Sequence, residues 1–267
     1  MPVSRQHALQ TRHLWQSGGV HLWPSGGVSR SQSHHRGHLV YAARGVLAVH
    51  TEHGTSLVPA NRVAWTPAAI THRHRAHGST DMRIVFVTAA LAQLLPARPA
   101  VLAVSDLARE ALLTLTGPRS YDPEIRDHHR EAQERLLLVL LDELQVAPEQ
   151  PLHLPRPTDP RLRALARLTE QGSTAPLSEL GREIGTSART LSRLLSDELG
   201  LTFYEWRTQM RVYRALVLLA EGHDVTYVAH ACGWASSSSF IAAFTGIVGT
   251  SPGRYRHALR RDQVARP

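Results

Sequence analysis

Lysine is missing from this chain of 267 residues, so all 30 basic residues are arginine, and cysteine occurs once, at Cys232. A single cysteine excludes a disulfide framework and a zinc site made of several thiolates. No apolar run is longer than six residues, as at Leu136–Leu141, whereas a membrane-spanning helix needs about 20. The first residues also lack the apolar segment of a secretion signal. We therefore expect a soluble, cytoplasmic protein that does not enter membranes.

Arginine and histidine are abundant by contrast. The net charge is +8, and 11 of the 17 histidines fall before residue 78. Residues 151–267 hold 15 arginines against 10 acidic residues, so the C-terminal part is the more basic per residue. This excess either suits a polyanion such as DNA or reflects a coding bias toward arginine. A hydrophobic share of 42% excludes a disordered chain, and the length suits two domains of about 150 residues.

The first half of the chain predicts strands. Residues 29–88 alternate apolar and polar side chains in short stretches that glycine, asparagine and proline interrupt, a pattern typical of a small sandwich or barrel. The predicted strands are His38–Tyr41, Val46–Thr51, Thr55–Pro59, Arg62–Thr66 and Arg83–Thr88. Residues 1–28 contain a near-repeat of Leu-Trp followed by Ser-Gly-Gly-Val, and they form either an arm or an edge strand.

Helical spacing follows the predicted strands. Ser105–Thr116 and Pro123–Val146 carry apolar residues at i, i+3 and i+4. The leucine stripe of the second helix packs either against its own domain or against a partner helix. Five prolines then fall within Pro148–Pro160, which predicts a semi-rigid linker and a domain boundary.

Residues 160–261 predict a second, all-helical domain with two helix-turn-helix units. The first unit joins Leu177–Ile184 to the helix after Ser187, and the second joins Val225–Cys232 to the helix after Ser236. One long helix separates the two units, and each tight turn contains glycine. The second helix of such a unit can enter a DNA major groove.

The helix after Ser187 separates its side chains by face. Leucines point one way, while Arg189, Ser192, Arg193 and Ser196 point the other, and Ser187 and Thr190 lie at its start. Arginine can donate two hydrogen bonds to guanine, and serine can bond base edges or phosphates. The outward face is therefore either a base-reading surface or an ordinary solvated face.

The second unit presents an uncharged outward face. Its residues are Ser236, Ser237, Ser238, Ser239, Ile241 and Ala242. They can contact phosphates, sugars or thymine methyl groups but offer little hydrogen-bonding code. The long helix between the units adds Arg211, with Arg207 and Arg214 on the same stripe. These arginines either reach phosphates or pair with acids such as Glu205.

Residues at fixed spacing extend across both units. In the first half they are Leu177, Leu180, Gly185, Ser187, Arg189, Thr190, Leu191, Arg193, Leu194, Gly200 and Phe203. In the second half they are Arg211, Ala215, Leu218, Leu219, Val225, Val228, Ala229, Gly233, Trp234, Ser236, Ser238, Phe240, Phe244, Gly249, Pro252, Tyr255 and Arg256. On this pattern residues 160–260 resemble the DNA-binding domain of the AraC/XylS family of bacterial transcription regulators.

The resemblance implies that both recognition helices lie on one face of one subunit and enter successive major grooves. The implied base-reading positions are Arg189, Ser192 and Arg193 in the first unit and Ser237, Ser238, Ile241 and Ala242 in the second. It also implies contact with RNA polymerase and favours activation. Gly181 departs from the usual alanine, at about 1 kcal/mol of helix propensity, and Leu195 replaces an aromatic residue. We expect the first unit to carry most of the specificity.

Several histidines of the first half share a strand face. Residues two and four apart on a strand point the same way, so Gln32, His34 and His38 lie together, and His72 approaches from a later strand. Three imidazoles suit a divalent transition metal, with Gln32 or water completing the shell. Alternatively, they line an organic-ligand pocket or a wet cavity. The alternating run from His72 to His77 is expected in a solvated surface loop.

The same histidines fit a second family pattern. Gly26-x5-Gln32-x-His34-x3-His38-x6-Gly45 and Pro67-x-Ala69-x-x-His72 resemble the two cupin motifs. Gln32, His38 and Ala69 stand where the cupin family has a metal-binding histidine, a carboxylate and a glycine. The resemblance therefore implies the fold, a cupin-like β-barrel, more strongly than it implies the metal.

Together these patterns predict an α+β multidomain protein. A cupin-like sensor and dimerisation domain with following helices occupies residues 1–147, a proline-rich linker residues 148–159, and an AraC-type all-α domain residues 160–261. We expect a non-enzymatic, sequence-specific DNA-binding regulator, an activator and a homodimer, controlled by a small molecule or metal. Two alternatives are a metal-dependent cupin enzyme with an accessory DNA-binding domain and a ligand-independent DNA-binding dimer. The missing carboxylate at the cupin metal position argues against the enzyme.

Overall fold

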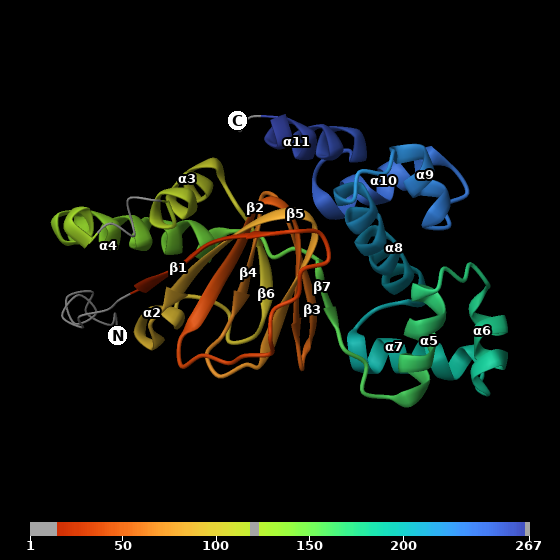
Figure 1. Cartoon of the computed structure of the whole chain (residues 1–267). Coiled ribbons are helices and arrows are strands. Elements are labelled where there is room, and N and C mark those ends of the chain that lie inside the picture. The colour runs from red at the N-terminus through yellow and green to blue at the C-terminus, as the bar shows by residue number, and fades with distance from the viewer. Residues whose placement is uncertain (1–14, 118–122, 265–267) are drawn as a thin grey trace. The chain divides into compact units, whose positions relative to one another are not determined.

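The computed structural model describes residues 15–117 and 123–264, and the chain divides into two compact units. The first unit extends to His153 without residues 53–55, and the second comprises those three residues and the chain from Leu154 onward. Figure 1 shows a sheet with helices in the first unit and a helical second unit. The described helices include none with the length and apolar content that crossing a membrane requires.

A seven-stranded sheet forms the framework of the first unit. Its strands are β1 (Trp15–Trp23), β2 (Gly37–Thr51), β3 (Gly54–Pro59), β4 (Arg62–Thr66), β5 (His72–Val87), β6 (Ala100–Ala103) and β7 (His153–Pro155). The order is β1-β5-β2-β3-β7, while β4 pairs with both β2 and β6. The sequence prediction of an all-strand region is confirmed, but β2 joins two predicted strands into one, and β5 begins eleven residues earlier than predicted, at His72.

The two longest strands, β2 and β5, form an antiparallel ladder that bends back on itself. His38 pairs with Phe86, and Thr51 at the other end pairs with His72. A straight strand would separate His38 from Thr51 by about 43 Å, at about 3.3 Å per residue. Nevertheless, the ring centroids of His38 and His72 are 4.3 Å apart. The ladder therefore curls until its two ends face each other.

The bend coincides with a bulge in β2. The register shifts between Ala42 and Arg44 and again between Arg44 and Val46. Gly45 between them has φ +78°, a left-handed conformation that favours glycine. A Cβ atom at this position would lie 2.5 Å from Oγ1 of Thr80. Glycine is thus required here by both the backbone conformation and the close approach of β5.

Alternation along the strands separates two cores. One core contains Leu39, Tyr41, Val63, Trp65, Val85 and Val87 and packs against the helices. The other, which we call the inner core, contains Val40, Ala42, Leu47, Val49, Val58, Ala64, Ala76, Met82 and Ile84. His38 belongs to the inner side because it precedes Val40 by two residues, and His74 belongs there because it precedes Ala76 by two.

Three helices cover one face of the sheet. They are α2 (Ala89–Ala92), α3 (Asp106–Leu115) and α4 (Pro123–Val146). Leu137, Leu140, Leu141 and Leu144 of α4 are buried in the first core. Of the two alternatives for the leucine stripe, packing within its own unit is therefore the one observed.

The proline-rich stretch follows the edge of the sheet. Pro148 accepts a hydrogen bond from the backbone N–H of Ala103 (3.1 Å), and Leu152 accepts one from that of Leu57 (2.8 Å). Strand β7 then pairs with β3. The division between the two units falls inside this stretch, between His153 and Leu154. Backbone hydrogen bonds therefore hold the stretch to the sheet before it enters the second unit.

The second unit consists of seven helices among the described residues. They are α5 (Pro160–Glu170), α6 (Leu177–Ile184), α7 (Ala188–Leu199), α8 (Phe203–Ala220), α9 (Val225–Ala231), α10 (Ser237–Val248) and α11 (Pro252–Val264). Side-chain N-caps begin five of them, at Asp159, Ser187, Thr202, Asp224 and Ser236. The helix starts after Ser187 and Ser236 and the helix pairs α6–α7 and α9–α10 are those that the sequence predicts.

Each helix-turn-helix unit has its own apolar centre. The first is built from Leu162, Leu165, Leu180, Leu191, Leu195 and Trp206. In the second, the rings of Trp234, Phe240, Phe244 and Tyr255 follow one another with centroids 5.6–6.1 Å apart. These contacts assign Trp234 and Tyr255 to packing.

Gly181 lies against the turn of the first helix-turn-helix unit. It is buried on α6, and a Cβ atom there would lie 2.8 Å from the backbone oxygen of Thr186. The glycine that costs α6 helix propensity therefore lets α6 approach the turn before α7 more closely than an alanine would. This approach sets the local position of α7.

Candidate functional site

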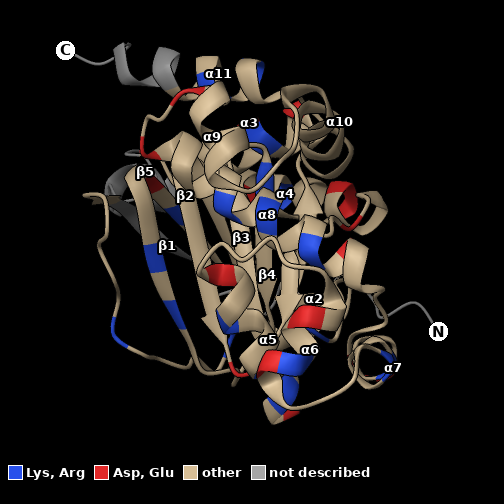
Figure 2. Cartoon of the chain, turned by 90° about the vertical axis from the view of Figure 1, so that its right-hand side faces the viewer, with Lys and Arg blue, Asp and Glu red and all other residues tan. Residues whose placement is uncertain are grey.

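The exposed face of α7 is the first candidate interface. Arg189, Ser192, Arg193 and Ser196 are all exposed, while Leu191 and Leu195 on the opposite side are fully buried. Arginines are visible on α7 and α8 in Figure 2. In the part of the chain that the structure describes, neither Arg189 nor Arg193 has a hydrogen-bonding or ion-pair partner. Both guanidinium groups are therefore available to a ligand outside the chain.

Other arginines of the same unit are engaged. Arg161 forms an ion pair with Asp159 (2.7 Å), and Arg163 donates to the backbone oxygen of Thr158 (2.8 Å). Both contacts fasten the start of α5. The contrast with α7 shows that only some of the basic residues in this unit are used in internal contacts.

Two residues of the predicted DNA-binding set on α7 form its N-cap. The hydroxyl oxygen of Ser187 accepts a hydrogen bond from the backbone N–H of Thr190 (3.1 Å), and the two hydroxyl groups are 2.9 Å apart. Ser187 remains exposed and Thr190 is partly exposed. Their local role is to fix the beginning of the helix and thereby the direction in which Arg189 leaves it.

The outward face of α10 is small and uncharged, as predicted. Ser237, Ser238, Ile241 and Ala242 are exposed, and 41% of Ile241 is accessible. Ser236 and Ser239 pair with each other as the N-cap: the Ser236 hydroxyl accepts from the Ser239 backbone N–H (3.2 Å), and the Ser239 hydroxyl donates to the Ser236 backbone oxygen (2.9 Å). This face can therefore interact with a DNA groove mainly through its shape and through apolar contacts.

Arg211 lies in a different environment from the arginines of α7. It is partly buried, its guanidinium carbon is 5.6 Å from the centre of the Trp234 ring, and burial lowers the pKa of its guanidinium. Its neighbour on the stripe, Arg207, donates to the backbone oxygen of Ala175 (3.0 Å) and lies over the ring of Phe203 (4.6 Å). Glu205, the acid considered as a partner, instead closes a capping box with Thr202.

The two helix-turn-helix units touch beside this arginine stripe. Gly233, in the turn after α9, has φ +75°, and a Cβ atom there would lie 2.7 Å from Cγ2 of Thr174, just before α6. The same Cβ would be 3.4 Å from the Arg211 guanidinium. This close approach joins the first helix-turn-helix unit to the second.

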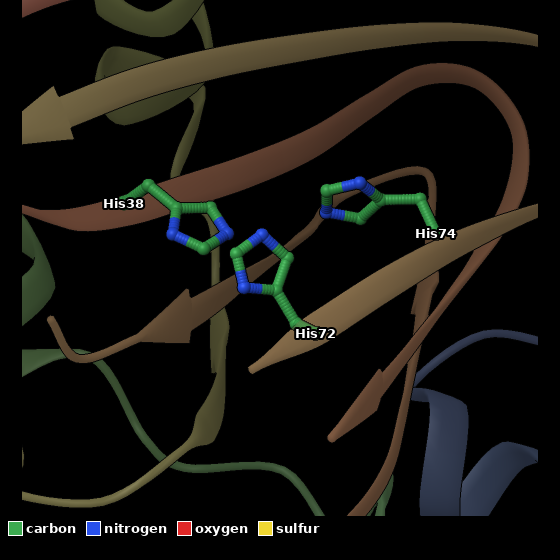
Figure 3. Close-up of side chains that lie close together, drawn as sticks. All are labelled: His38, His72 and His74. Atoms are coloured by element: carbon green, nitrogen blue, oxygen red, sulfur yellow. The ribbon is translucent and has the colours of Figure 1, made fainter. Parts of the chain in front are cut away.

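A cluster of three histidines is the second candidate site. His38 comes from β2, and His72 and His74 come from β5; their exposed fractions are 1%, 2% and 1%. Each offers one ring nitrogen within 4.8 Å of those of the other two. Figure 3 shows the three rings turned toward one another. The bend of the β2–β5 ladder brings them together from opposite ends of the strands.

The other residues of the predicted set lie around this cluster. The ring centroid of His34 is 5.2 Å from that of His72 and 5.7 Å from that of His38. Gln32 and His72 exchange two backbone hydrogen bonds of 2.9 Å, which places them opposite each other on neighbouring segments. Gln32 and His34 are partly exposed, so they border the buried cluster.

His74 was not among the predicted site residues, and the prediction of a solvated surface loop from His72 to His77 is wrong. These residues begin β5, where His72 and His74 point inward and Arg73 and Arg75 point outward. The signal was present in the sequence, because a strict alternation of histidine and arginine is the period of a half-buried strand. The charge of the arginines instead favoured the prediction of a surface loop.

Burial favours the neutral form of His38 and His72. Desolvation lowers the pKa of His38 well below 6.5, and the neighbouring His72, His74 and His34 lower it further. Desolvation also lowers the pKa of His72, although its hydrogen bond to the backbone oxygen of Ile70 opposes the shift. Neutral imidazoles present lone pairs, which is the form that binds metals.

Comparison with known proteins identifies the helical half and extends beyond it. A family model described as a helix-turn-helix domain matches residues 180–258. The chain is similar to the HTH-type transcriptional regulator NimR of Escherichia coli (strain K12), with 32% identity over 241 residues, 88% of this chain and 85% of NimR. It is also similar to the HTH-type transcriptional regulator RipA of Corynebacterium glutamicum, with 34% identity over 102 residues, 38% of this chain and 31% of RipA.

A solved structure adds a likeness over the C-terminal part. The DNA-binding domain of AdpA, in complex with a target DNA, is 27% identical, with a TM-score of 0.37, and the match covers 41% of this chain and all of that one. The helix-turn-helix match spans parts of both predicted units, and the identity to NimR extends over most of both chains. The chain therefore belongs to the AraC/XylS family of helix-turn-helix transcription regulators.

Proposed function

We propose that this regulator reads its operator mainly through the exposed face of α7, while α10 positions the protein in a neighbouring groove. The observation that carries the proposal is the pair Arg189 and Arg193, both exposed and both without partners among the described residues. Each guanidinium can donate two hydrogen bonds to O6 and N7 of guanine. One such pair of bonds discriminates against a wrong base by about 1–3 kcal/mol.

Serines complete the proposed reading surface on α7. Ser192 and Ser196 lie one helical turn apart on the same exposed face and can bond to bases or phosphates. On α10, Ser237 and Ser238 are placed to contact phosphates, and Ile241 and Ala242 to contact thymine methyl groups or sugars. The absence of charge among these four residues is the reason for assigning them the positioning role.

The first unit of the chain supplies the proposed control. We infer that it binds an effector, so that DNA-competent conformations become more or less populated. As in the sequence-based expectation, the regulator would act in the cytoplasm as a homodimer that contacts RNA polymerase and activates transcription. The enzyme alternative has less support, since the matched relatives are named as transcription regulators.

A mobility-shift experiment at stated salt tests the DNA-reading proposal. The probe is DNA from upstream of the chain's own gene, and an excess of unrelated DNA serves as competitor. We expect a retarded band that survives the competitor and that Arg189→Ala/Arg193→Ala abolishes. Circular dichroism of the variant should match that of the wild type, because both side chains are exposed.

Two results would contradict the proposal. One is the absence of a specific band with or without candidate effectors. The other is a specific band of unchanged strength from the doubly substituted variant, which would move base reading away from α7.

A further inference from the structure

We propose that His38, His72 and His74 bind one divalent transition-metal ion inside the sheet of the first unit. This deepens the sensor part of the proposed function by naming the class of ligand that its inner core takes. The set differs from the four residues that the sequence suggested, since His74 enters it and Gln32 and His34 lie at its border. The metal site itself is independent of whether α7 reads DNA.

The distances between donor atoms suit a small ion. Tetrahedral binding at about 2.0–2.1 Å places two imidazole nitrogens about 3.4 Å apart. The three candidate nitrogens already lie within 4.8 Å of one another. Rotation of the rings about their side-chain bonds would bring the nitrogens to that separation.

A hydrogen bond fixes the tautomer of His72 in the form that binds a metal. Its Nδ1 is 2.9 Å from the backbone oxygen of Ile70, a group that can only accept. The ring proton therefore lies on Nδ1, and Nε2 is left with a lone pair directed into the buried cluster. Metal-binding histidines generally show this arrangement, in which the second nitrogen donates to a carbonyl and fixes the ring.

His38 supplies a second, independent reason. It is 99% buried, and neither of its ring nitrogens has a hydrogen-bond partner among the residues that the structure describes. A polar group buried in this way destabilises a fold by about 1–3 kcal/mol. A metal ion bound to one nitrogen would turn that unfavourable burial into a favourable contact.

The donor set also selects the kind of metal. All three ligands are neutral imidazoles, which suit Zn²⁺, Co²⁺, Ni²⁺, Cu²⁺ and Fe²⁺ and disfavour Mg²⁺ and Ca²⁺, whose preferred ligands are oxygens. The single cysteine, Cys232, belongs to the second unit. Three protein ligands leave one position of a tetrahedral ion open. That position would take water or an effector atom.

The test uses the full chain without a histidine tag. The protein is stripped with a chelator and titrated with Co²⁺, whose visible absorption reports tetrahedral nitrogen coordination, and Zn²⁺ competition gives the affinity. His72→Gln and His74→Gln remove one ligand each. His77→Gln is the matched control, since His77 is a partly buried histidine three residues further along β5 and outside the cluster.

We expect one ion per chain for the wild type and for His77→Gln. Removal of a residue that only hydrogen-bonds to a metal ligand lowers metal affinity by about 10–100-fold. Each variant that removes a ligand should lose more affinity than that. Thermal unfolding and circular dichroism identify variants that fail to fold, and for these His74→Asn and His72→Asn replace the glutamine variants. Absence of Co²⁺ and Zn²⁺ binding by the folded wild type would overturn the proposal.

A second outcome would also overturn it. If His74→Gln binds as tightly as the wild type, the ligands are the set suggested by the sequence and not the one proposed from the structure. A mobility shift with the same preparations separates the two proposals. Metal binding without DNA binding would support the metal site and contradict the proposed operator reading. DNA binding without metal binding would contradict only the metal site.

Discussion

Arg189 and Arg193 show how much depends on the environment of a single residue type. Arg161, Arg163 and Arg207 are held by internal acceptors, whereas the two arginines of α7 are exposed and without partners among the described residues. The exposed arginines of α7 contact either base edges or phosphates, and the two roles make different demands on the side chain. A base-reading arginine needs its planar fork, while a phosphate contact needs only positive charge.

Conservative replacement of Arg189 separates these two roles. We expect Arg189→Lys to retain non-specific DNA binding but to lose about 10–100-fold in affinity for the operator, corresponding to about 1–3 kcal/mol for one bidentate base contact. Quantitative mobility shifts with operator and scrambled DNA measure both affinities. An equal loss on both DNAs would assign Arg189 to phosphate contact.

His77 makes the stability of the first unit depend on pH. Desolvation, with Arg75 and His50 nearby, lowers its pKa from 6.5 to about 4. As the pH falls from about 6.5 toward 4, the unfolded chain therefore binds a proton that the folded chain does not, so the free energy of unfolding decreases. After allowance for the solvent-accessible part of the ring, we expect a decrease of about 1 kcal/mol from this residue.

Urea unfolding at several pH values checks this effect. His77→Gln should flatten the decrease between pH 6.5 and 4 and leave stability at pH 8 nearly unchanged. Identical pH profiles for the variant and the wild type would show that other groups, such as the partly buried His50, account for the acid sensitivity.

At the scale of elements, the bulge in β2 decides the shape of the first unit. Gly45 and Gly26 both have positive φ, but a Cβ atom at Gly45 would meet Thr80, while one at Gly26 would meet nothing within 4 Å. We expect Gly45→Ala to destabilise the unit by about 2 kcal/mol or more, because backbone strain and crowding add. Gly26→Ala should cost only the backbone contribution of about 1 kcal/mol.

Thermal and urea unfolding compare the two glycine variants. If the bend depends on Gly45, its variant should also weaken Co²⁺ binding, because His38 and His72 meet only through the bend. Equal stability losses in the two variants would show that crowding against β5 is relieved at little cost.

The contact between the two helix-turn-helix units is a second feature that matters at the scale of elements. We expect Gly233→Ala to weaken operator binding, because a Cβ atom 2.7 Å from Cγ2 of Thr174 must push the units apart. Thr174→Ser removes that methyl group and should restore part of the affinity in the double variant. A mobility shift measures the rescue, and a double variant no better than Gly233→Ala would assign the loss to backbone strain alone.

At the scale of the whole molecule, the two units have separate cores. Those of the first lie on either side of the sheet, and that of the first helix-turn-helix unit lies among α5, α6, α7 and α8. We therefore expect residues 156–267 alone to bind the operator with specificity, while any effect of metal or effector on binding requires the full chain. Mobility shifts with fragment and full chain test this, and a fragment that is folded but does not bind would contradict it.

The sequence by itself determined the features that depend on neighbouring residues. The helix starts after Ser187 and Ser236, the face segregation of α7 and the uncharged face of α10 follow from the local sequence, and the structure has all of them. The order of strands, then helices, then a helical unit was equally predictable. Local hydrogen bonding and helical periodicity are sufficient to specify such features.

Only the tertiary structure decided which histidines meet. His38 and His74 lie 36 positions apart in sequence, on strands whose ends would be remote if they were straight. Their juxtaposition depends on the bulge at Gly45, which has a local signal for a break but none for the direction of the bend. The partners of Arg207 and the contact of Gly233 with Thr174 could not be predicted from the sequence for the same reason. Non-local packing selects among arrangements that the local sequence permits.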